Sequence, residues 1–589
     1  MAHNSSFYTT NIETYKAEVS SLYKQLTALS MSRLLVFLAT GVGVYFTFGM
    51  WQAAVGIAVM GIVIFLFLLN KHSNLKTQHQ LKKALVAINE EEIKIESGDF
   101  YDKKEGNTFQ DANHQYSLDI DLFGRGSFFQ FIDRTSTVDG ALTLANALKA
   151  NSITEITRRQ EAIKELSEKA NWRQHFQATA RLIKTETELS ALKDWLQKQQ
   201  SFLPKVMGWL PKAFLLVSLI IFGLAFTGVI GIQFIGYWLF AGLIVTGKYL
   251  KKINVLASKA DKIRDTFRQY SVLLKAIESE TFTSQLLQEK QQQIQLKDEK
   301  ASAILQSFSR SLDALDNRNN LISAIFGNGY FITDLKNTYA IEKWLENYKN
   351  LVDDWFEVVS FFDAYNSLGN YAFNHSGFIY PEIVSNNNTT KAVNLGHPML
   401  APKKRVDNTF EITSEQFFII TGANMAGKST FLRTVSLHIV MANMGLPVCA
   451  ESSRYVPVKL ITSMRTSDSL TDDSSYFFSE LTRLKYIVDA IETDKYFIIL
   501  DEILKGTNST DKAIGSRKFV EKLVASNATG IIATHDLSLC EIENTLTEVK
   551  NYYFDAQIIN DELYFDYTFK KGICQNMNAS FLLKKMEIV

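Results

Sequence analysis

The sequence is poor in cysteine and carries no net charge. Its three cysteines, Cys449, Cys540 and Cys574, are too few for a disulfide framework, so we expect a reducing compartment around the parts of the chain that meet water. The 62 Lys and Arg residues equal the 62 Asp and Glu residues, which leaves a net charge of zero. Whole-chain charge therefore gives no sign of the basic surface that nucleic-acid binding needs.

Proline is absent from residues 1–203 and 212–380. Because proline interrupts helices, these stretches favour long helices, above all over residues 153–200 and 251–315. Hydrophobic residues make up 46% of the chain and charged residues 21%, which excludes a disordered protein. At about 100–200 residues per domain, a chain of this length should form several domains.

Two long runs, residues 34–70 and 213–247, contain no Asp, Glu, Lys or Arg. One bilayer crossing needs about 20 apolar residues, so each run is long enough for two helices. The polar or glycine-containing segments 49–52 and 228–233 are the expected turns. The sequence therefore predicts two transmembrane hairpins, with buried core helices of a soluble protein as the alternative reading.

Basic residues flank both runs, whereas the two expected turns have none. By the positive-inside rule this pattern places both termini and all large segments in the cytoplasm of a multi-pass protein of the cytoplasmic membrane. A cleaved signal peptide is excluded for the first run, because it is too long and follows a polar segment. The flanking residues are Arg33, Lys71, Lys76, Lys205, Lys212, Lys248, Lys251 and Lys252.

A phosphate-binding loop follows the apolar run 417–420 and precedes a helix-like segment. Its glycines let backbone N–H groups turn towards phosphates, and the helix N-terminus adds a favourable dipole. Lys428 would reach the β and γ phosphates, and Ser429 would bind magnesium. The sequence thus predicts ATP and Mg²⁺ as cofactors. The predicted nucleotide-binding residues are Gly422, Ala423, Asn424, Met425, Ala426, Gly427, Lys428, Ser429 and Thr430.

Two more apolar runs end in polar groups suited to ATP hydrolysis. The run 496–500 ends in Asp501 and Glu502, and the run 530–533 leads to His535. Carboxyl ends of parallel strands meet at one sheet edge, so these groups should face the phosphates. We assign Asp501 to magnesium, Glu502 to the attacking water, and His535 to sensing the γ-phosphate.

Around these strands the sequence resembles the ATPase domain of the MutS family of DNA mismatch-repair proteins. Residues 424–430 resemble that family's phosphate loop, residues 501–511 its acidic strand end and following loop, and residues 474–481 its Ser-Thr-Phe signature. The match covers about 393 to the C-terminus. A weaker resemblance, at 121–140 and 157–166, extends to the start of the family's helical core and lever region, and residues 396–398 resemble the short motif that leads into its ATPase domain.

The resemblance implies a homodimer in which each subunit completes its partner's nucleotide site. It makes Ser475, with Thr507 and Asn508 of the loop after Glu502, the candidates for contacts in trans. It also places Arg405 and Val406 where the family stacks residues on adenine. DNA is the partner that the resemblance implies; protein partners are not indicated.

The chain also departs from the family pattern. Members that recognise mismatches carry an N-terminal domain with a Phe-x-Glu wedge, but here a polar helix and a charge-free run occupy that region. Ala423 and Ala426 replace the family's usual Pro and Gly, and neither change removes a phosphate-binding side chain. We therefore expect a membrane-anchored variant that lacks the mismatch-reading N-terminal domain.

The predicted architecture is an α/β P-loop NTPase domain of ABC/MutS type, preceded by an all-α core and lever region with two transmembrane hairpins. A transporter of the ABC type and a membrane scaffold that uses ATP as a conformational clamp are the alternatives. The Leu-Ser-Gly-Gly-Gln signature of ABC proteins is missing, and a clamp has no use for Glu502 as a base. The predicted segments are an N-terminal amphipathic helix (1–33), hairpin one (34–70), a helical linker (71–117), core and lever helices (118–212), hairpin two (213–247), further lever and core helices (248–392) and the ATPase domain (393–589).

Overall fold

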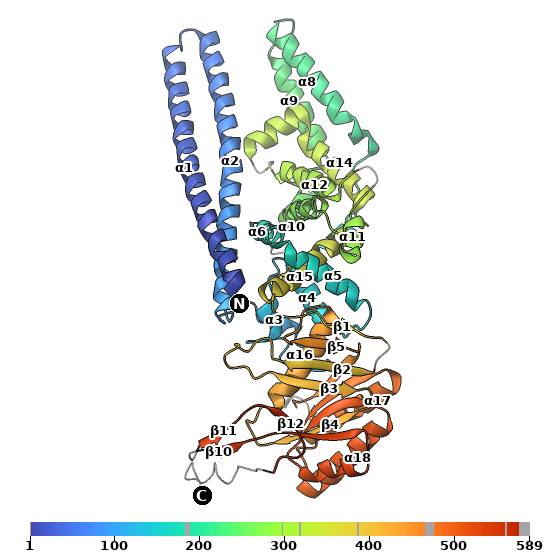
Figure 1. Ribbon diagram of the computed structural model, residues 1–589. Coiled ribbons are helices and arrows are strands. Elements are labelled where there is room, and N and C mark those ends of the chain that lie inside the picture. The colour runs from blue at the N-terminus through green and yellow to red at the C-terminus, as the bar shows by residue number, and fades with distance from the viewer. Residues whose placement is uncertain are drawn as a thin grey trace.

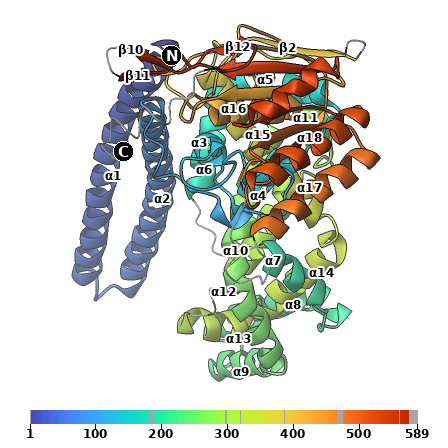
Figure 2. The same ribbon diagram turned by 90° about the horizontal axis from the view of Figure 1, so that it is seen from below.

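The computed structural model describes residues 2–182, 189–296, 299–316, 318, 320–385, 388–465, 476–559 and 562–575. The molecule is elongated, with a sheet-containing C-terminal domain at one end, two apolar helical projections at the other and a helical core between them (Figure 1). Seen from below, the first projection stands beside the helical core rather than within it (Figure 2).

The first projection is an antiparallel pair of very long helices, α1 (Ala2–Phe46) and α2 (Trp51–Glu96), joined at residues 47–50. Both helices are long and apolar enough to cross a membrane. The predicted turn lies where expected, but the helices continue through the predicted boundaries at 33 and 70. At about 1.5 Å per residue each helix is about 68 Å long, so its polar half extends far beyond a bilayer about 30 Å thick.

The second projection is the shorter pair α8 (Leu210–Phe226) and α9 (Gln233–Gly247), with its turn at residues 227–232. These helices have 17 and 15 residues, below the roughly 20 that a crossing needs. Among the described residues only α1 and α2 combine the length and the apolar composition that a crossing needs, so the prediction of four transmembrane helices is not supported. The charge-free run is long enough for two crossings, but the turn and the helix ends use part of it.

The helical core lies between the projections and the sheet domain. The predicted long helix over 153–200 is three helices, and that over 251–315 is also three, of which only the first is long. The chain turns at 281–284, where the Glu165 carboxylate accepts bonds from the N–H groups of Thr283 (2.8 Å) and Ser284 (2.7 Å). The core helices are α3 (Phe128–Ile132), α4 (Val138–Lys149), α5 (Ile156–Glu168), α6 (Ala170–Leu182), α7 (Leu189–Lys198), α10 (Leu250–Glu278), α11 (Gln285–Gln292), α12 (Ala301–Asp316), α13 (Asn328–Phe331), α14 (Thr333–Tyr348) and α15 (Val352–Asn374).

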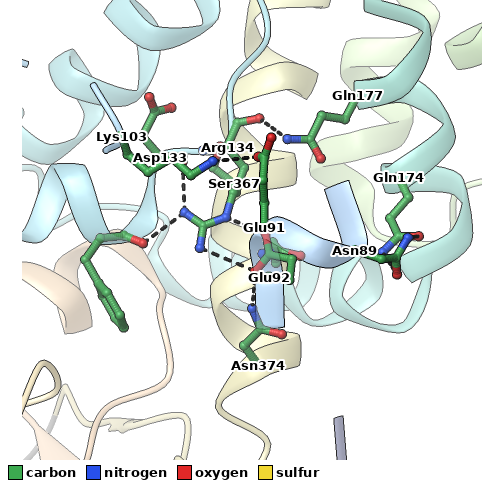
Figure 3. A network of polar contacts seen from close by, with 12 residues as sticks. Asn89, Glu91, Glu92, Lys103, Asp133, Arg134, Gln174, Gln177, Ser367 and Asn374 are labelled. Carbon is green, nitrogen blue, oxygen red and sulfur yellow. Dashed lines mark hydrogen bonds and ion pairs between the residues drawn. The ribbon is translucent and has the colours of Figure 1, made fainter. Parts of the chain in front are cut away.

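A buried ion pair attaches the base of α2 to the core (Figure 3). Arg134 Nε lies 2.5 Å from Glu92 Oε1, and Asn374 of α15 donates to Glu92 Oε2 over 2.9 Å. Burial disfavours the charge on Glu92, yet Arg134 holds the pKa of that carboxyl below its ordinary value. Nearby, Asn89 and Gln174 of α6 exchange two amide bonds of 3.1 and 3.0 Å. These contacts fix where the long hairpin leaves the core.

The C-terminal domain contains a six-stranded sheet of order β12-β9-β4-β8-β7-β6 and a four-stranded sheet of order β1-β5-β2-β3. In the larger sheet only β12 pairs antiparallel. Alternate residues of β4 face two different cores: 418 and 420 join the core shared with the helical region, whereas 417 and 419 face α17 and α18. The elements are β1 (Glu382–Ile383), β2 (Thr389–Leu395), β3 (Asn408–Thr413), β4 (Phe417–Gly422), α16 (Lys428–Met444), β5 (Ser452–Tyr455), β6 (Lys459–Ser463), α17 (Tyr476–Thr493), β7 (Tyr496–Asp501), α18 (Ser509–Ala525), β8 (Thr529–Ala533), β9 (Val549–Phe554), β10 (Gln557–Ile559), β11 (Glu562–Tyr564) and β12 (Phe569–Lys571).

Candidate nucleotide site

The three strand ends singled out in the sequence lie next to one another. β8 pairs in parallel with β4 on one side and with β7 on the other. Asp501, the last residue of β7, is in register with Ala533, the last residue of β8. The loops after all three strands therefore leave the sheet at the same edge.

The loop between β4 and α16 has backbone conformations that depend on glycine. Gly422 and Gly427 have φ angles of 150° and 103°, and Met425, an exposed residue, has 67°. A Cβ atom on Gly422 would lie 2.6 Å from the carbonyl oxygen of Phe554, so no larger residue fits there. The loop ends where α16 begins, at Lys428, and so delivers free N–H groups of a helix N-terminus to this edge.

Lys428 is buried and turned back over the loop. Its Nζ donates to the carbonyl oxygens of Gly422 (2.8 Å) and Ala423 (3.0 Å). The same atom lies 3.3 Å from Nε2 of His535. Burial lowers the pKa of Lys428, while the nearby carboxylates Asp501 and Glu502 oppose that shift. The structure thus holds one ammonium group at the centre of the loop.

Two polar pairs complete this edge of the sheet. Ser429 Oγ donates to Asp501 Oδ2 over 2.7 Å, and His535 Nε2 lies 2.8 Å from Glu502 Oε1. The hydrogen bond from His535 lowers the pKa of Glu502 to about 2, although partial burial acts in the opposite direction. Glu502 is therefore a carboxylate at neutral pH.

The backbone bends at Glu502, so the side chains of Asp501 and Glu502 have different partners. Glu502 and Leu504 have φ angles of 52° and 59°, which non-glycine residues rarely adopt. Such conformations cost on the order of 1–3 kcal/mol and are often found at functional sites. The N–H of Glu502 donates to the carbonyl of Ala533 over 2.9 Å, which holds the bend in place. As a result Asp501 bonds to α16 while Glu502 bonds to His535.

The loop opens into a cavity of about 570 Å³. Arg405 and Val406 line it, as the resemblance implies, but the Arg405 guanidinium is bound to Asp407 at two points, over 2.5 and 3.1 Å. Val406 is exposed. The sequence analysis missed Tyr567, an exposed ring on the cavity wall whose carbonyl accepts a bond from Asn408 (3.0 Å). Tyr567 lies 34 residues beyond Ala533, the nearest of the three strand ends, so no local pattern linked it to the site.

Of the three residues predicted to contact the partner's nucleotide site, the structure describes Thr507 and Asn508. Ser475 lies outside the described residues. Thr507 and Asn508 do not line the cavity; Asn508 instead caps α18 by accepting a 2.9 Å bond from the N–H of Asp511. The sequence analysis also missed Glu480, a buried residue of α17 that accepts a 3.0 Å bond from the N–H of Lys505. This bond connects α17, which begins within the Ser-Thr-Phe signature and which we call the signature helix, to the loop after Glu502.

The magnesium prediction concerns Ser429 and Asp501. Within the described ranges, His, Cys, Asp and Glu side chains form no group of three that could hold a metal unaided. Magnesium in nucleotide sites usually has one or two protein oxygen ligands, and phosphates and water supply the others. The Ser429 hydroxyl and the Asp501 carboxylate, already in contact, fit that requirement.

Comparison with known proteins places the C-terminal region in a family. The family model described as MutS domain V matches residues 418–585. MutS protein homolog 4 of Homo sapiens is 33% identical over 226 residues, which are 36% of this chain and 23% of that protein. DNA mismatch repair protein MutS of Methanococcoides burtonii is 35% identical over 163 residues (27% of this chain, 18% of that protein), and that of Aquifex pyrophilus 33% over 182 residues (30% and 21%). The chain thus spans less than a quarter of the length of these curated relatives.

Proposed function

Because the chain belongs to the MutS family through its C-terminal domain, we propose that it is a membrane-anchored MutS-type ATPase that acts as a homodimer on DNA. The observation that supports the ATPase most directly is the meeting of Lys428, the Ser429–Asp501 pair and the Glu502–His535 pair at one sheet edge. Each of these groups corresponds to one requirement of phosphoryl transfer to water.

In the proposed hydrolysis, each of these residues has a separate role. Lys428, released from the loop carbonyls, binds the β and γ phosphate oxygens. Ser429 and Asp501 hold the metal, and bound Mg²⁺ would supply charge neutralisation at the phosphates. Glu502, ionised at neutral pH, orients the attacking water and takes its proton. His535 fixes the Glu502 side chain and lies within reach of both Lys428 and the γ-phosphate side of the cavity.

The proposed dimer completes two nucleotide sites. Ser475 is the proposed contact from one subunit to the γ-phosphate bound by the other. The buried Glu480–Lys505 contact supports this arrangement, because it connects the start of α17 to the loop after Glu502. Movement of the signature segment and of the hydrolytic site would then be coupled.

The proposed anchor is the hairpin α1–α2. Its outer half, residues 34–70, is free of charge and exposed, as hydrocarbon contact requires, and basic residues follow on both inner sides. By the positive-inside rule, this pattern supports the proposal that both termini and the ATPase domain lie at the cytoplasmic face of the membrane. A transporter receives less support, since exporters need bundles of spanning helices and, of the described helices, only α1 and α2 are both long and apolar enough.

Steady-state ATP hydrolysis by the detergent-solubilised protein tests the proposal. It should be measured without DNA and with homoduplex, mismatched and branched DNA at low salt, where electrostatic binding is strongest. We expect basal hydrolysis that at least one DNA form stimulates. Glu502→Gln is the inactive blank, and Glu492→Gln, an exposed glutamate at the end of α17, is the matched control. Hydrolysis that no DNA form changes would refute the DNA role and leave the ATPase standing.

A further inference from the structure

A third charge-free segment lies beside the short projection. Residues 321–333 contain no Asp, Glu, Lys or Arg. The segment is too short to stand out in a sequence, yet its apolar side chains are turned outward: Leu321, Ile322 and Phe326 are 73%, 68% and 50% exposed. It begins with a π-helical turn at Ser323–Gly327 and continues into α13.

This segment is built into α8 and α9 by close contacts. Ser218 of α8 donates to the carbonyl of Tyr330 over 2.5 Å and accepts a 2.8 Å bond from Trp238 of α9. A Cβ atom on Gly242 would lie 2.2 Å from the carbonyl oxygen of Gly329, so the two backbones touch. We call the unit formed by α8, α9 and residues 320–331 the apolar head.

The exposed side chains of the apolar head are mainly hydrophobic. Phe226 and Ile232 at its tip are 87% and 81% exposed. A soluble protein rarely exposes a contiguous apolar surface of this kind without a partner. Other exposed apolar residues of the head are Leu216, Leu219, Ile220, Val229, Tyr237, Phe240 and Ile244.

The base of the apolar head has the chemistry of a membrane interface. Exposed Trp209 lies just before α8, and tryptophan is enriched at the headgroup level of bilayers. The exposed lysines at this level would attract anionic headgroups. They are Lys205, Lys212, Lys248, Lys251 and Lys252.

Most of the turn at the tip of the head meets the main requirement for contact with hydrocarbon. In lipid, each backbone N–H needs a partner within the protein. The N–H groups of four successive residues, 227–230, all bond to carbonyls of the last turn of α8. The Thr227 hydroxyl also donates to the carbonyl of Gly223 over 3.1 Å. Four of the six residues of the turn therefore have their N–H groups paired within the protein.

We propose that the apolar head inserts into one leaflet of an anionic bilayer, as a second lipid contact beside the hairpin α1–α2. Its helices are about 25 and 22 Å long at about 1.5 Å per residue, too short to cross about 30 Å of hydrocarbon. The head and the hairpin tip both lie at the end of the molecule opposite the sheet domain (Figure 1). Both therefore reach the same membrane surface from the same side.

This inference takes its orientation from the proposed anchor but goes beyond it, because it assigns a lipid contact to residues 320–331. The test uses the full-length chain in vesicles of mixed anionic and zwitterionic lipid. Single cysteines replace Phe326, Val59 or Lys485 and are labelled with an environment-sensitive fluorophore; the three native cysteines are buried. Spin-labelled lipids then quench from a shallow or a deep position in the acyl chain.

At Phe326→Cys we expect loss of fluorescence mainly with the shallow quencher. Val59 lies in the middle of the charge-free part of α2, residues 51–70, so at Val59→Cys the deep quencher should act more strongly. At Lys485→Cys neither quencher should act. Quenching at 59 but not at 326 would overturn the inference and leave the anchor intact. A shielded but unquenched label at 326 would also overturn it, because a protein partner or second copy would then cover the head. No quenching at 59 would refute the proposed anchor itself, whatever the result at 326.

A variant that introduces two negative charges tests whether residues 320–331 insert together with α8 and α9. Ile322→Asp combined with Phe326→Asp changes only exposed side chains and should leave folding intact. We expect a label at Phe226→Cys to lose its quenching in this variant, since the charges would hold the head in the headgroup layer. Unchanged quenching at 226 would show that α8 and α9 insert without this segment and would overturn its assignment.

Discussion

Glu502 and His535 follow the ends of the neighbouring strands β7 and β8, and the hydrogen bond between them decides when Glu502 can act as a base. With this bond the pKa of Glu502 falls to about 2, so the carboxylate is ionised at neutral pH and in mildly acidic solution. We predict that His535→Gln raises the pKa of Glu502 towards its ordinary value. Protonation would then remove the base at higher pH, and the acid limb of hydrolysis should move upward.

The measurement is the pH profile of kcat/KM for ATP in the parent and in His535→Gln. His438→Gln is unsuitable as a control because that histidine is buried. His72→Gln serves instead, because His72 is a partly exposed residue of α2, outside the nucleotide site. A uniform loss of rate with no shift of the acid limb would mean that His535 acts on the γ-phosphate alone and not through Glu502.

Tyr567 offers a flat aromatic surface in the same cavity as Val406. If adenine packs on that ring, Tyr567→Ala should remove about 0.5–1.5 kcal/mol of stacking, or about a 2- to 13-fold gain in Kd for ATP. Tyr567→Phe should bind as the parent does. Titration calorimetry measures both, with Tyr564→Ala, an exposed residue outside the cavity, as the control. Equal affinity for Tyr567→Ala and the control would place the base elsewhere.

The residues of this site differ in how far sequence could identify them. Lys428, Ser429, Asp501, Glu502 and His535 lie in the first turn of a helix or within two residues of a strand end, and short-range pattern marks such positions. Tyr567 and Glu480 reach their places through tertiary packing, which no spacing rule describes. Arg405 lines the cavity, but its contact with adenine stays a prediction, and its two bonds to Asp407 were not expected from the sequence.

At the scale of elements, the joint between α2 and the core depends on the Glu92–Arg134 pair (Figure 3). Removing one partner of a buried ion pair leaves an uncompensated charge and typically costs about 3–5 kcal/mol. We predict that Glu92→Gln weakens the joint by about this amount. Hydrogen exchange at the N–H groups of residues 85–95 should increase, while exchange in the sheet domain stays unchanged.

The control for this prediction is Glu90→Gln, since Glu90 forms an exposed pair with Lys16 and such pairs contribute little. Replacing both partners, as Glu92→Met with Arg134→Met, should recover much of the loss, because no buried charge then remains. Equal exchange in Glu92→Gln and Glu90→Gln would show that the amide bonds around Asn89 suffice to hold the hairpin.

Composition alone could not separate the two charge-free runs. Both lack charge over a similar length, yet one forms the adjoining ends of two long helices and the turn between them, and the other forms α8, α9 and a six-residue turn. The difference arises outside the runs, because polar residues on both sides of 34–70 continue the helices, whereas Trp209 and Tyr249 lie at breaks in the helical path. Residues 320–331 escaped notice because their packing partners lie far away in the sequence, 87 residues for Gly242 against Gly329 and 112 residues for Ser218 against Tyr330.

At the scale of the whole molecule, the sheet domain that carries the candidate nucleotide site is joined to the helical core by several hydrogen bonds rather than by a free linker. Arg159 of α5 donates to the carbonyl of Asn443 in α16 over 2.7 Å, and Asn151 exchanges two bonds with the backbone of Leu460 in β6. Arg483 of α17 bonds to the carbonyls of Gln115 and Thr462. Changes at the phosphate loop or the signature helix therefore reach the helical core directly.

This arrangement gives the proposed membrane attachment a measurable effect on the proposed ATPase activity. If both nucleotide sites need two subunits, confinement to a bilayer raises the effective concentration of one subunit around another. We predict that hydrolysis per molecule in vesicles rises with the protein-to-lipid ratio and does not change when the vesicle suspension is diluted. In detergent, by contrast, the same dilution should lower it, because each subunit then diffuses in three dimensions.

Both series can be run on one preparation, with Glu502→Gln protein added at constant total protein to reveal shared sites. If a dimer has composite sites, inactive subunits should lower the activity of active ones at high surface density. Rates that are independent of surface density, together with no effect of added Glu502→Gln subunits, would show that a single subunit hydrolyses ATP. The membrane would then serve to hold the helical core and the sheet domain at a surface rather than to bring subunits together.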